Sequence, residues 1–157
     1  MPPITALLHT ENDALRLGRA LETLYPCDNI LIIDHGSSDG TVRLAREFGA
    51  QVFDARIGAS PEQYLRPSFS GWILCLDPIE SLTESLAATL YEWKSMPPTA
   101  AAFSVFLREE TANGWIAIPT AQTRLVPADW KRWEGRLPAT DQLAPALEGE
   151  LLRFAFP

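Results

Sequence analysis

The sequence is poor in residues that mark several classes of protein. It contains only two cysteines, Cys27 and Cys75, which lie far apart without a pair of histidines beside them. This spacing excludes a disulfide framework and the usual structural zinc motifs, and it favours a reducing, cytoplasmic environment. Basic residues are also few, because 13 Lys and Arg stand against 20 Asp and Glu, which gives a net charge of −7. A basic face for nucleic acid or anionic lipid is therefore not expected.

Long apolar runs, targeting signals and phosphate-binding fingerprints are absent as well. No stretch approaches the roughly 20 apolar residues that a membrane-spanning helix needs. Residues 1–13 carry no basic segment and no cleavage site, so a signal peptide is not predicted. Neither G-x-G-x-x-G nor G-x-x-x-x-G-K-[ST] occurs, which argues against the common dinucleotide-binding and P-loop proteins.

The composition present is that of one globular domain. The chain has 157 residues, of which 46% are hydrophobic and 21% are charged, and this is enough to bury a sizeable core. Hydrophobic periodicity predicts four strands, at 4–9, 29–34, 51–55 and 72–77. It also predicts three helices, at 11–25, 41–50 and 81–95.

Residues at the ends of these helices indicate how each begins or stops. Thr10 or Asn12 is expected to cap the first helix, and Gly49 to end the second. Ser81 with Glu84 three residues later is the capping-box pattern, which predicts the start of the third helix.

The order of the elements predicts an α/β fold. Strands alternating with helices over residues 1–97 are typical of an open, mostly parallel sheet. After Pro98 the pattern changes, and residues 100–127 favour two or three strands joined through a hairpin at Asn113–Gly114. We expect residues 98–157 to form a smaller second half of the same domain.

Polar residues follow three of the predicted strands. They are residues 9–13, residues 34–39 and Asp77. In open α/β sheets, ligands bind outside the carboxyl ends of the strands, so these residues predict a ligand site along one edge. The alternative is that Ser38 or Asp39 only caps the following helix and that the loop only connects two elements.

Three segments resemble the nucleotide-sugar-binding half of family-2 glycosyltransferases. They are ITALLHTEND at 4–13, NILIIDHGSSDGTVRLAREFGAQVF at 29–53 and GWILCLD at 71–77. The resemblance covers residues 4–94 and is to the bacterial group that builds lipopolysaccharide core and related cell-surface glycans. It implies the three-layer GT-A (nucleotide-diphospho-sugar transferase) fold, with helices on both faces of a mostly parallel sheet.

The same resemblance implies an activity. The chain is expected to bind a nucleotide-activated sugar, a UDP-sugar, and to transfer the glycosyl group with inversion to a glycan or lipid-linked sugar acceptor. That role belongs to cell-envelope biogenesis on the cytoplasmic side. The rival hypotheses are a degenerate, non-catalytic sugar-nucleotide-binding module or partner subunit, and an α/β enzyme of unrelated chemistry, since fold alone does not fix function.

The resemblance also assigns roles to individual residues. Thr10 and Asp13 match nucleoside-contacting positions, although Asp13 stands where glutamate is usual. Asp34 matches the acid that pairs with uracil or ribose, and Asp39 the second acid of that loop. Asp77 matches the first carboxylate of D-x-D, which contacts the ribose or the metal ion.

The chain departs from the family pattern at the metal site. The segment after the fourth strand reads LDPIE, so Ile79 stands where the second aspartate of D-x-D would bind Mg²⁺ or Mn²⁺. Asp77 and Glu80 are the remaining candidate ligands. Because Ile79 offers no oxygen and both ions require oxygen ligands, the sequence predicts weak metal dependence or none.

Two further positions differ from the family pattern. Where the family has an R-N pair that contacts the nucleotide, this chain offers Arg56 or Arg66. The late family segment W-x-G-x-x-H-E is only faintly matched, since Pro138 and Ala139 stand in place of its His and Glu. This leaves Glu134 and Asp141 as candidates for the general base that takes a proton from an acceptor hydroxyl.

Overall fold

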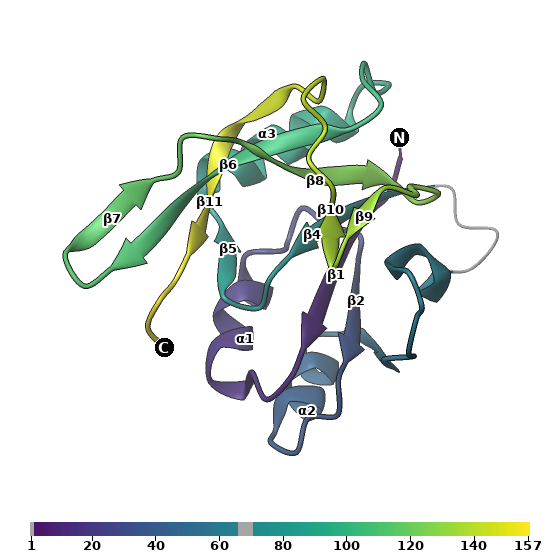
Figure 1. The fold of residues 1–157 in the computed structure, drawn as a ribbon, viewed down its shortest axis with the longest axis vertical. Helices are drawn as coiled ribbons and strands as arrows, with labels where there is room; N and C mark the ends of the chain where they lie inside the picture. The colour runs from purple at the N-terminus through teal and green to yellow at the C-terminus, as the bar shows by residue number, and fades with distance from the viewer. Residues whose placement is uncertain (1, 66–70) are drawn as a thin grey trace.

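The apolar runs of the first 76 residues form the parallel part of the sheet (Figure 1). The computed structural model describes residues 2–65 and 71–157. In it β1 pairs with both β2 and β4, and β2 pairs with β3 at the edge. The strands are β1 (Ile4–Thr10), β2 (Asn29–Asp34), β3 (Gln51–Asp54) and β4 (Trp72–Leu76). All four lie within one residue of their predicted bounds.

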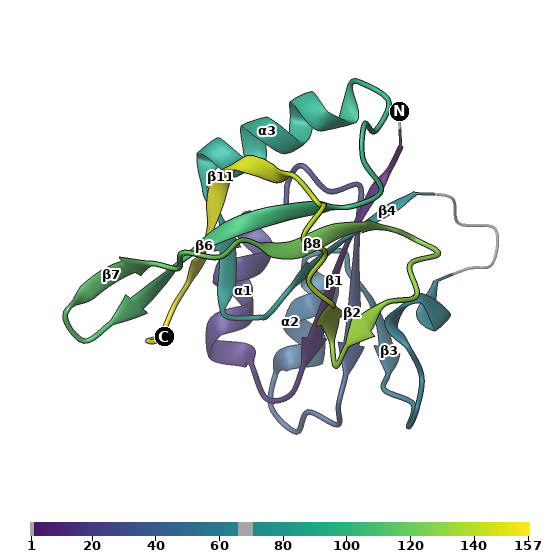
Figure 2. The ribbon, with the colours of Figure 1, turned by 45° about the horizontal axis from the view of Figure 1, so that its top comes forward.

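Three α-helices cover one face of this sheet (Figure 2). They are α1 (Ala14–Glu22), α2 (Thr41–Glu47) and α3 (Glu84–Lys94). Their apolar residues, such as Leu17, Ala45 and Leu90, join Leu8 of β1 in the larger hydrophobic core. None of the helices in the described ranges is long and apolar enough to cross a bilayer.

The opposite face of the sheet carries a second, smaller core. Leu7, Ile33 and Ile73 point to this side and pack with Tyr64 and Trp130. Tyr64 belongs to the 3-10 helix η1 (Pro61–Tyr64), which lies in the connection after β3. Helical segments thus flank both faces, with three α-helices on one side and a single turn on the other.

The C-terminal half extends the same sheet with mixed strand directions. The order continues from β4 through β8 (Gln122–Pro127), β6 (Phe103–Thr111) and β11 (Ala146–Arg153) to β5 (Glu80–Leu82). Only β6 and β11 run parallel here. The hairpin predicted at Asn113–Gly114 is confirmed, because β7 (Gly114–Ala117) pairs with β6 and projects from the molecule (Figure 2).

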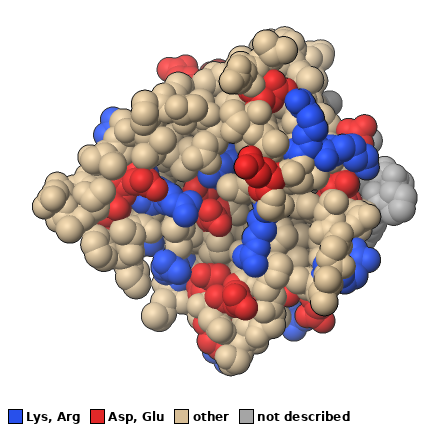
Figure 3. Space-filling model, in the orientation of Figure 1, with Lys and Arg blue, Asp and Glu red and all other residues tan. Residues whose placement is uncertain are grey.

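A short two-stranded ribbon lies over the second core. β9 (Trp133–Glu134) and β10 (Leu137–Pro138) are joined through Gly135, whose φ of 65° is in the left-handed region that glycine favours. The ribbon packs against β4 and β8. On the face shown in Figure 3, acidic and basic side chains are interspersed, without a continuous patch of one sign.

The predicted cap of α1 is wrong. The helix begins after Asp13, not after Thr10 or Asn12. Thr10 is instead the last residue of β1, and its hydroxyl donates to Asp34 at 2.7 Å. Asn12 has a φ of 54°, and it places its side-chain oxygen 2.8 Å from the backbone N–H of Ser38 in the neighbouring loop.

The caps of the other two helices also differ from prediction. α3 is capped by Thr83, whose Oγ1 accepts from the backbone N–H of Leu86 at 3.2 Å, because Ser81 is part of β5. In α2 the C-cap is Phe48, and Gly49 follows it with a φ of 83°. Glycine is common at that following position.

Candidate functional site

A cleft of about 520 Å³ lies at the carboxyl ends of β1, β2 and β3. The wall nearest the sheet carries His9 and His35, the loop after β3 contributes Arg56, and the β9–β10 turn contributes Arg136. Tyr64 of η1 closes one side. This is the edge at which α/β sheets bind their ligands, and it is the edge predicted from the sequence.

A second cleft of similar size lies at the other end of the sheet. Its volume is about 540 Å³, and its lining includes Leu21, Tyr25, Cys27 and Phe48. Burial raises the pKa of the Cys27 thiol to about 12, so it is not a nucleophile at neutral pH. We place the candidate site at the first cleft, because two histidines and two arginines converge there.

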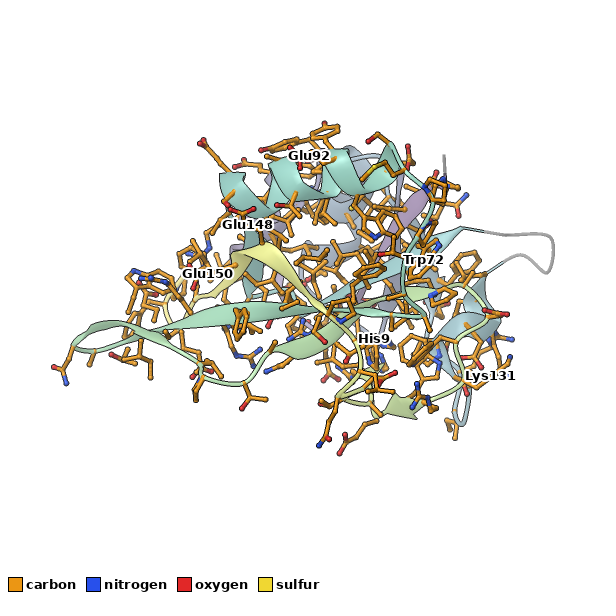
Figure 4. All side chains as sticks on the ribbon, turned by 90° about the horizontal axis from the view of Figure 1, so that it is seen from above. His9, Trp72, Glu92, Lys131, Glu148 and Glu150 are labelled. Atoms are coloured by element: carbon orange, nitrogen blue, oxygen red, sulfur yellow. The ribbon has the colours of Figure 1, made fainter. Side chains whose placement is uncertain are left out.

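The two histidines of the cleft form a hydrogen-bonded pair. His9 lies on the side of the sheet away from α3 (Figure 4), and its Nδ1 is 2.8 Å from Nε2 of His35. Burial lowers the pKa of His9 to about 4, with further lowering by His35 and Arg136. Burial and then Arg136 lower the pKa of His35 too. Both rings are therefore neutral at pH 7, and one N–H is shared between them.

One nitrogen of this pair has no protein partner. His9 Nε2 is buried and makes no hydrogen bond within the described residues. Buried polar atoms are nearly always hydrogen-bonded, so this nitrogen is an exception to the general rule.

Two arginines bring positive charge to the cleft from different elements. Arg56 lies over the ring of Tyr64, with 4.7 Å between Cζ and the ring centroid, and donates to the carbonyl of Gln63 at 3.2 Å. Arg136 is close enough to both histidines for its charge to lower their pKa values. The one acid of the lining is Glu11. Two guanidinium groups and one carboxylate favour an anionic ligand, such as a phosphate group.

Asp34 is fully engaged by the protein. It is buried, with its carboxylate accepting from Thr10 Oγ1 at 2.7 Å, Ser37 Oγ at 2.6 Å and the Ser37 backbone N–H at 2.9 Å. Burial alone would raise the pKa of Asp34, but the hydrogen bonds from Ser37 and Thr10 outweigh it and hold the pKa below its ordinary value. Asp34 therefore ties the loop after β1 to the loop after β2.

Asp39 and Asp13 reinforce the same connection. Asp39 accepts from the backbone N–H of Thr41 at 3.0 Å and from that of Ala14 at 3.2 Å, so it satisfies donors at the starts of two helices. Hydrogen bonds from Thr41 lower the pKa of Asp39. The backbone N–H of Asp13 donates to Thr41 Oγ1 at 2.8 Å, and its carboxylate accepts from the N–H of Glu11.

The residues predicted to bind a metal ion are paired with arginines. Glu80 is fully buried and forms a two-pronged ion pair with Arg124, at 2.6 and 2.9 Å. Arg153 contacts Asp77 at 2.9 Å and Glu80 at 3.1 Å. In the ranges that the structure describes, no three His, Cys, Asp or Glu side chains are grouped to hold a metal. This donor set does not fit Mg²⁺ or Mn²⁺, which bind through free carboxylate oxygens.

The two candidate general bases lie in different surroundings. Asp141 accepts from Arg132 at 2.7 Å and from the backbone N–H of Leu143 at 2.9 Å. The Leu143 and Arg132 hydrogen bonds lower the pKa of Asp141. Glu134 is exposed and directly precedes Gly135, which lines the cleft. Arg66, the alternative to Arg56, lies outside the described residues.

The structure therefore separates the predicted site residues into two groups. Thr10, Asp13, Asp34 and Asp39 share one hydrogen-bonded network between two loops, whereas the carboxylates of the D-x-D region are bound to arginines. Arg136, Arg124 and Arg153 were not predicted from the sequence. Only Arg136 carried a local signal, since it follows Gly135 in the segment that faintly matches the family pattern W-x-G-x-x-H-E.

Comparison with known proteins relates this arrangement to glycosyltransferases, although no family model matches the chain. A Rickettsia felis protein named as an uncharacterized glycosyltransferase is 31% identical over 90 residues, which cover 55% of this chain and 32% of that protein. A Rickettsia prowazekii protein with the same description is 29% identical over 90 residues, covering 55% of this chain and 31% of that protein. The chain thus spans about a third of the length of these relatives.

A solved structure confirms the fold. The crystal structure of S. aureus TarS 1–349 superposes with a TM-score of 0.52 and 13% identity, covering 75% of this chain and 38% of that one. The chain has the predicted α/β GT-A fold, and its sequence is glycosyltransferase-like.

Proposed function

We propose that the protein binds a nucleotide-activated sugar, a UDP-sugar, in the cleft at the ends of β1, β2 and β3, and transfers the glycosyl group to a glycan or lipid-linked acceptor. The observation that carries the proposal is the convergence of Arg56, Arg136 and the histidine pair on one cleft of about 520 Å³. The fold and the named relatives support it. On this proposal the protein acts in the cytoplasm of a bacterium, in the synthesis of cell-envelope glycans.

In this assignment, each group of the cleft has a separate task. Arg56 and Arg136 bind the diphosphate and offset the charge that grows on it as the sugar leaves, because fixed guanidinium groups stabilise developing negative charge. His9 and His35 form the neutral part of the cleft lining. Asp34 and Asp39 hold the two loops in place, and Thr10 and Asp13 complete that support on the nucleoside side.

The acid that activates the acceptor is proposed to be Glu134. It is the exposed candidate and it adjoins the wall of the cleft, where an acceptor hydroxyl would approach the bound sugar. Asp141, the other candidate, has both oxygens occupied by Arg132 and Leu143. A general base needs a free oxygen within hydrogen-bond reach of the proton it removes.

A second candidate function is a non-catalytic binding module or partner subunit. The observation that favours it is the engagement of the acids: Asp34, Asp77 and Glu80 all face protein donors. Release of UDP from a bound UDP-sugar in the presence of acceptor glycans distinguishes the two functions, since a binding module gives stabilisation without turnover.

Thermal denaturation with a panel of UDP-, GDP- and CMP-sugars tests the proposal. We expect a UDP-sugar to raise the melting temperature of the wild type by mass action. Arg136→Gln should lose this rise, although its melting temperature without ligand should equal that of the wild type. Arg46→Gln, which removes the same charge from the exposed face of α2, is the matched control and should keep the rise. Equal stabilisation of Arg136→Gln would contradict the assignment of the cleft.

A further inference from the structure

The densest set of charges outside the cleft lies where β4 ends and β5 begins. Three acids, Asp77, Glu80 and Glu109, surround two arginines, Arg124 and Arg153. We refer to these five residues as the arginine–carboxylate cluster. Its two key acids occupy the place where the fold's family resemblance implies a divalent metal ion.

Arg124 has a complete set of acceptors. Its two terminal nitrogens contact the two oxygens of Glu80 at 2.6 and 2.9 Å, and they also reach the carbonyl of Cys75 at 3.1 Å and Gln122 Oε1 at 2.8 Å. Nε contacts Gln122 Oε1 at 3.2 Å. The side chains of Arg124 and Glu80 are 1% and 0% exposed. A buried charge pair is stable only when its hydrogen bonds are made, and here they are.

Arg153 links Glu80 to the other two acids of the cluster. Its Nη1 lies 2.9 Å from Asp77 Oδ2 and 3.1 Å from Glu80 Oε2, and its Nε lies 3.5 Å from Glu109 Oε1. The neighbouring Ile79 provides no oxygen. One guanidinium group thus joins the two acids that a divalent cation would otherwise bridge.

A metal ion entering this cluster would have to displace an arginine from a carboxylate. Glu80 is closed to it, because removal of one partner from a buried ion pair leaves an uncompensated charge. Asp77 would then be the single protein ligand, whereas Mg²⁺ and Mn²⁺ need six oxygen ligands at short distance. Metal binding is therefore disfavoured by the release of Arg153 from Asp77, as well as by the absence of a carboxylate at position 79.

We infer that Arg153 takes the place of a divalent cation at the end of β4, so that Asp77 and Glu80 bind neither Mg²⁺ nor Mn²⁺. The chain itself supplies the positive charge at this position, on the strand β11. This inference concerns ion binding by the free protein and stands whether or not the cleft binds a UDP-sugar.

Titration of Mn²⁺ followed by electron paramagnetic resonance tests the inference, because the signal of the free aqueous ion falls when it binds. We expect the wild type to leave the signal unchanged at millimolar Mn²⁺. Ile79→Asp restores the missing carboxylate but keeps Arg153, so it should bind weakly. Ile79→Asp combined with Arg153→Gln should bind at least an order of magnitude more tightly than Ile79→Asp.

Two controls separate Arg153 from a general effect of charge. Ile79→Asp with Arg108→Gln removes an exposed arginine that pairs with Glu150 on the same sheet, and it should bind Mn²⁺ no better than Ile79→Asp. Ile79→Asp with Arg153→Lys keeps the charge and should also stay weak.

Either of two results would overturn the inference. One is binding of Mn²⁺ by the wild type that Asp77→Asn abolishes. The other is binding by Ile79→Asp as tight as that of the variant that also lacks Arg153. The wild-type titration decides the matter even where a double variant does not fold.

Discussion

At the scale of single residues, the sequence indicated where charged groups would gather but not which of them would meet. Asp34 and Asp77 were placed correctly at the ends of strands, because a change from apolar to polar residues marks a strand end. Their partners come from far along the chain: Arg153 is 76 residues from Asp77. Such pairs depend on the packing of the whole sheet, so no local pattern in the sequence predicts them.

The buried pair of Glu80 and Arg124 should be costly to break on one side only. Glu80→Ala leaves the Arg124 guanidinium uncompensated, and we expect it to lower the free energy of unfolding by about 3–5 kcal/mol. Glu80→Leu with Arg124→Met replaces both charges by apolar groups and should cost clearly less. Urea denaturation measures the free energy of unfolding of both variants. Equal losses of stability in the single and double variants would show that the uncompensated charge does not cause the loss.

The depressed pKa of His9 predicts a specific loss of stability in mild acid. The folded-state pKa of about 4 lies below the ordinary 6.5, so the unfolded chain takes up the proton first. The free energy of unfolding should therefore fall as the pH drops from about 6.5 to about 4. The lowered pKa of His35 adds to the loss in the same direction.

Urea denaturation across this pH range checks the prediction. His9→Gln removes the titrating group and should flatten the profile. Carboxylates with lowered pKa values, such as Asp34, also contribute to the stability of the folded state. They lose this contribution only as the pH falls through their folded-state pKa, which lies below the ordinary value for aspartate. If the free energy of unfolding of His9→Gln falls with pH as steeply as that of the wild type, other groups cause the loss of stability.

At the scale of helices and strands, prediction succeeded where a segment is long and regular. β1, β2 and β4 are continuous apolar runs, and the hairpin of β6 and β7 has a recognisable turn. β5 has only three residues, and in β11 Glu148, Gly149 and Glu150 interrupt the apolar residues, so neither has a clear strand pattern. β5 forms by pairing with β11, and β11 pairs with β6 as well, so both strands depend on contacts far along the chain.

Gly149 explains why β11 can approach α3 so closely. A Cβ atom at this position would lie 2.4 Å from the backbone nitrogen and 2.6 Å from the Cα atom of Leu86, and its φ is 100°. Gly149→Ala combines overpacking with an unfavourable backbone conformation and should cost about 3 kcal/mol or more.

Gly114→Ala is the control for the backbone conformation alone. Gly114 has a φ of 112°, but a Cβ atom there would meet nothing within 4 Å. Its substitution should cost about 1–2 kcal/mol. Thermal or urea denaturation compares the two variants, and a Gly149→Ala protein as stable as Gly114→Ala would contradict the close approach to Leu86.

At the scale of the whole molecule, the two halves of the chain share one sheet and both hydrophobic cores. β4, the last strand of the parallel part, pairs with β8 from the second half. Trp72 and Trp93 from the first half pack edge to face, at 5.0 Å between ring centroids, and both contact Phe103 from the second half. We propose that residues 1–157 fold as a single domain.

The fragment of residues 1–97 tests this proposal. It keeps all residues of the parallel sheet but loses β8, β11 and Phe103, which exposes one edge of β4 and part of the aromatic cluster. We expect it to lack the cooperative urea unfolding of the full chain. A sharp transition in the fragment, monitored by circular dichroism, would instead show that the first half is a domain by itself.

The position of β11 between β6 and β5 has a consequence for the order of folding. β6 and β7 are joined by a two-residue turn and can pair early, whereas Leu82 and Leu151 pair although they lie 69 positions apart in the sequence. Closing so long a loop costs entropy before any contact is gained, so pairing at this edge is expected late on the pathway. The contacts of Arg153 would then be absent from the transition state. These contacts then lower the rate of unfolding and leave the rate of folding unchanged. Arg153 would therefore lengthen the lifetime of the native state.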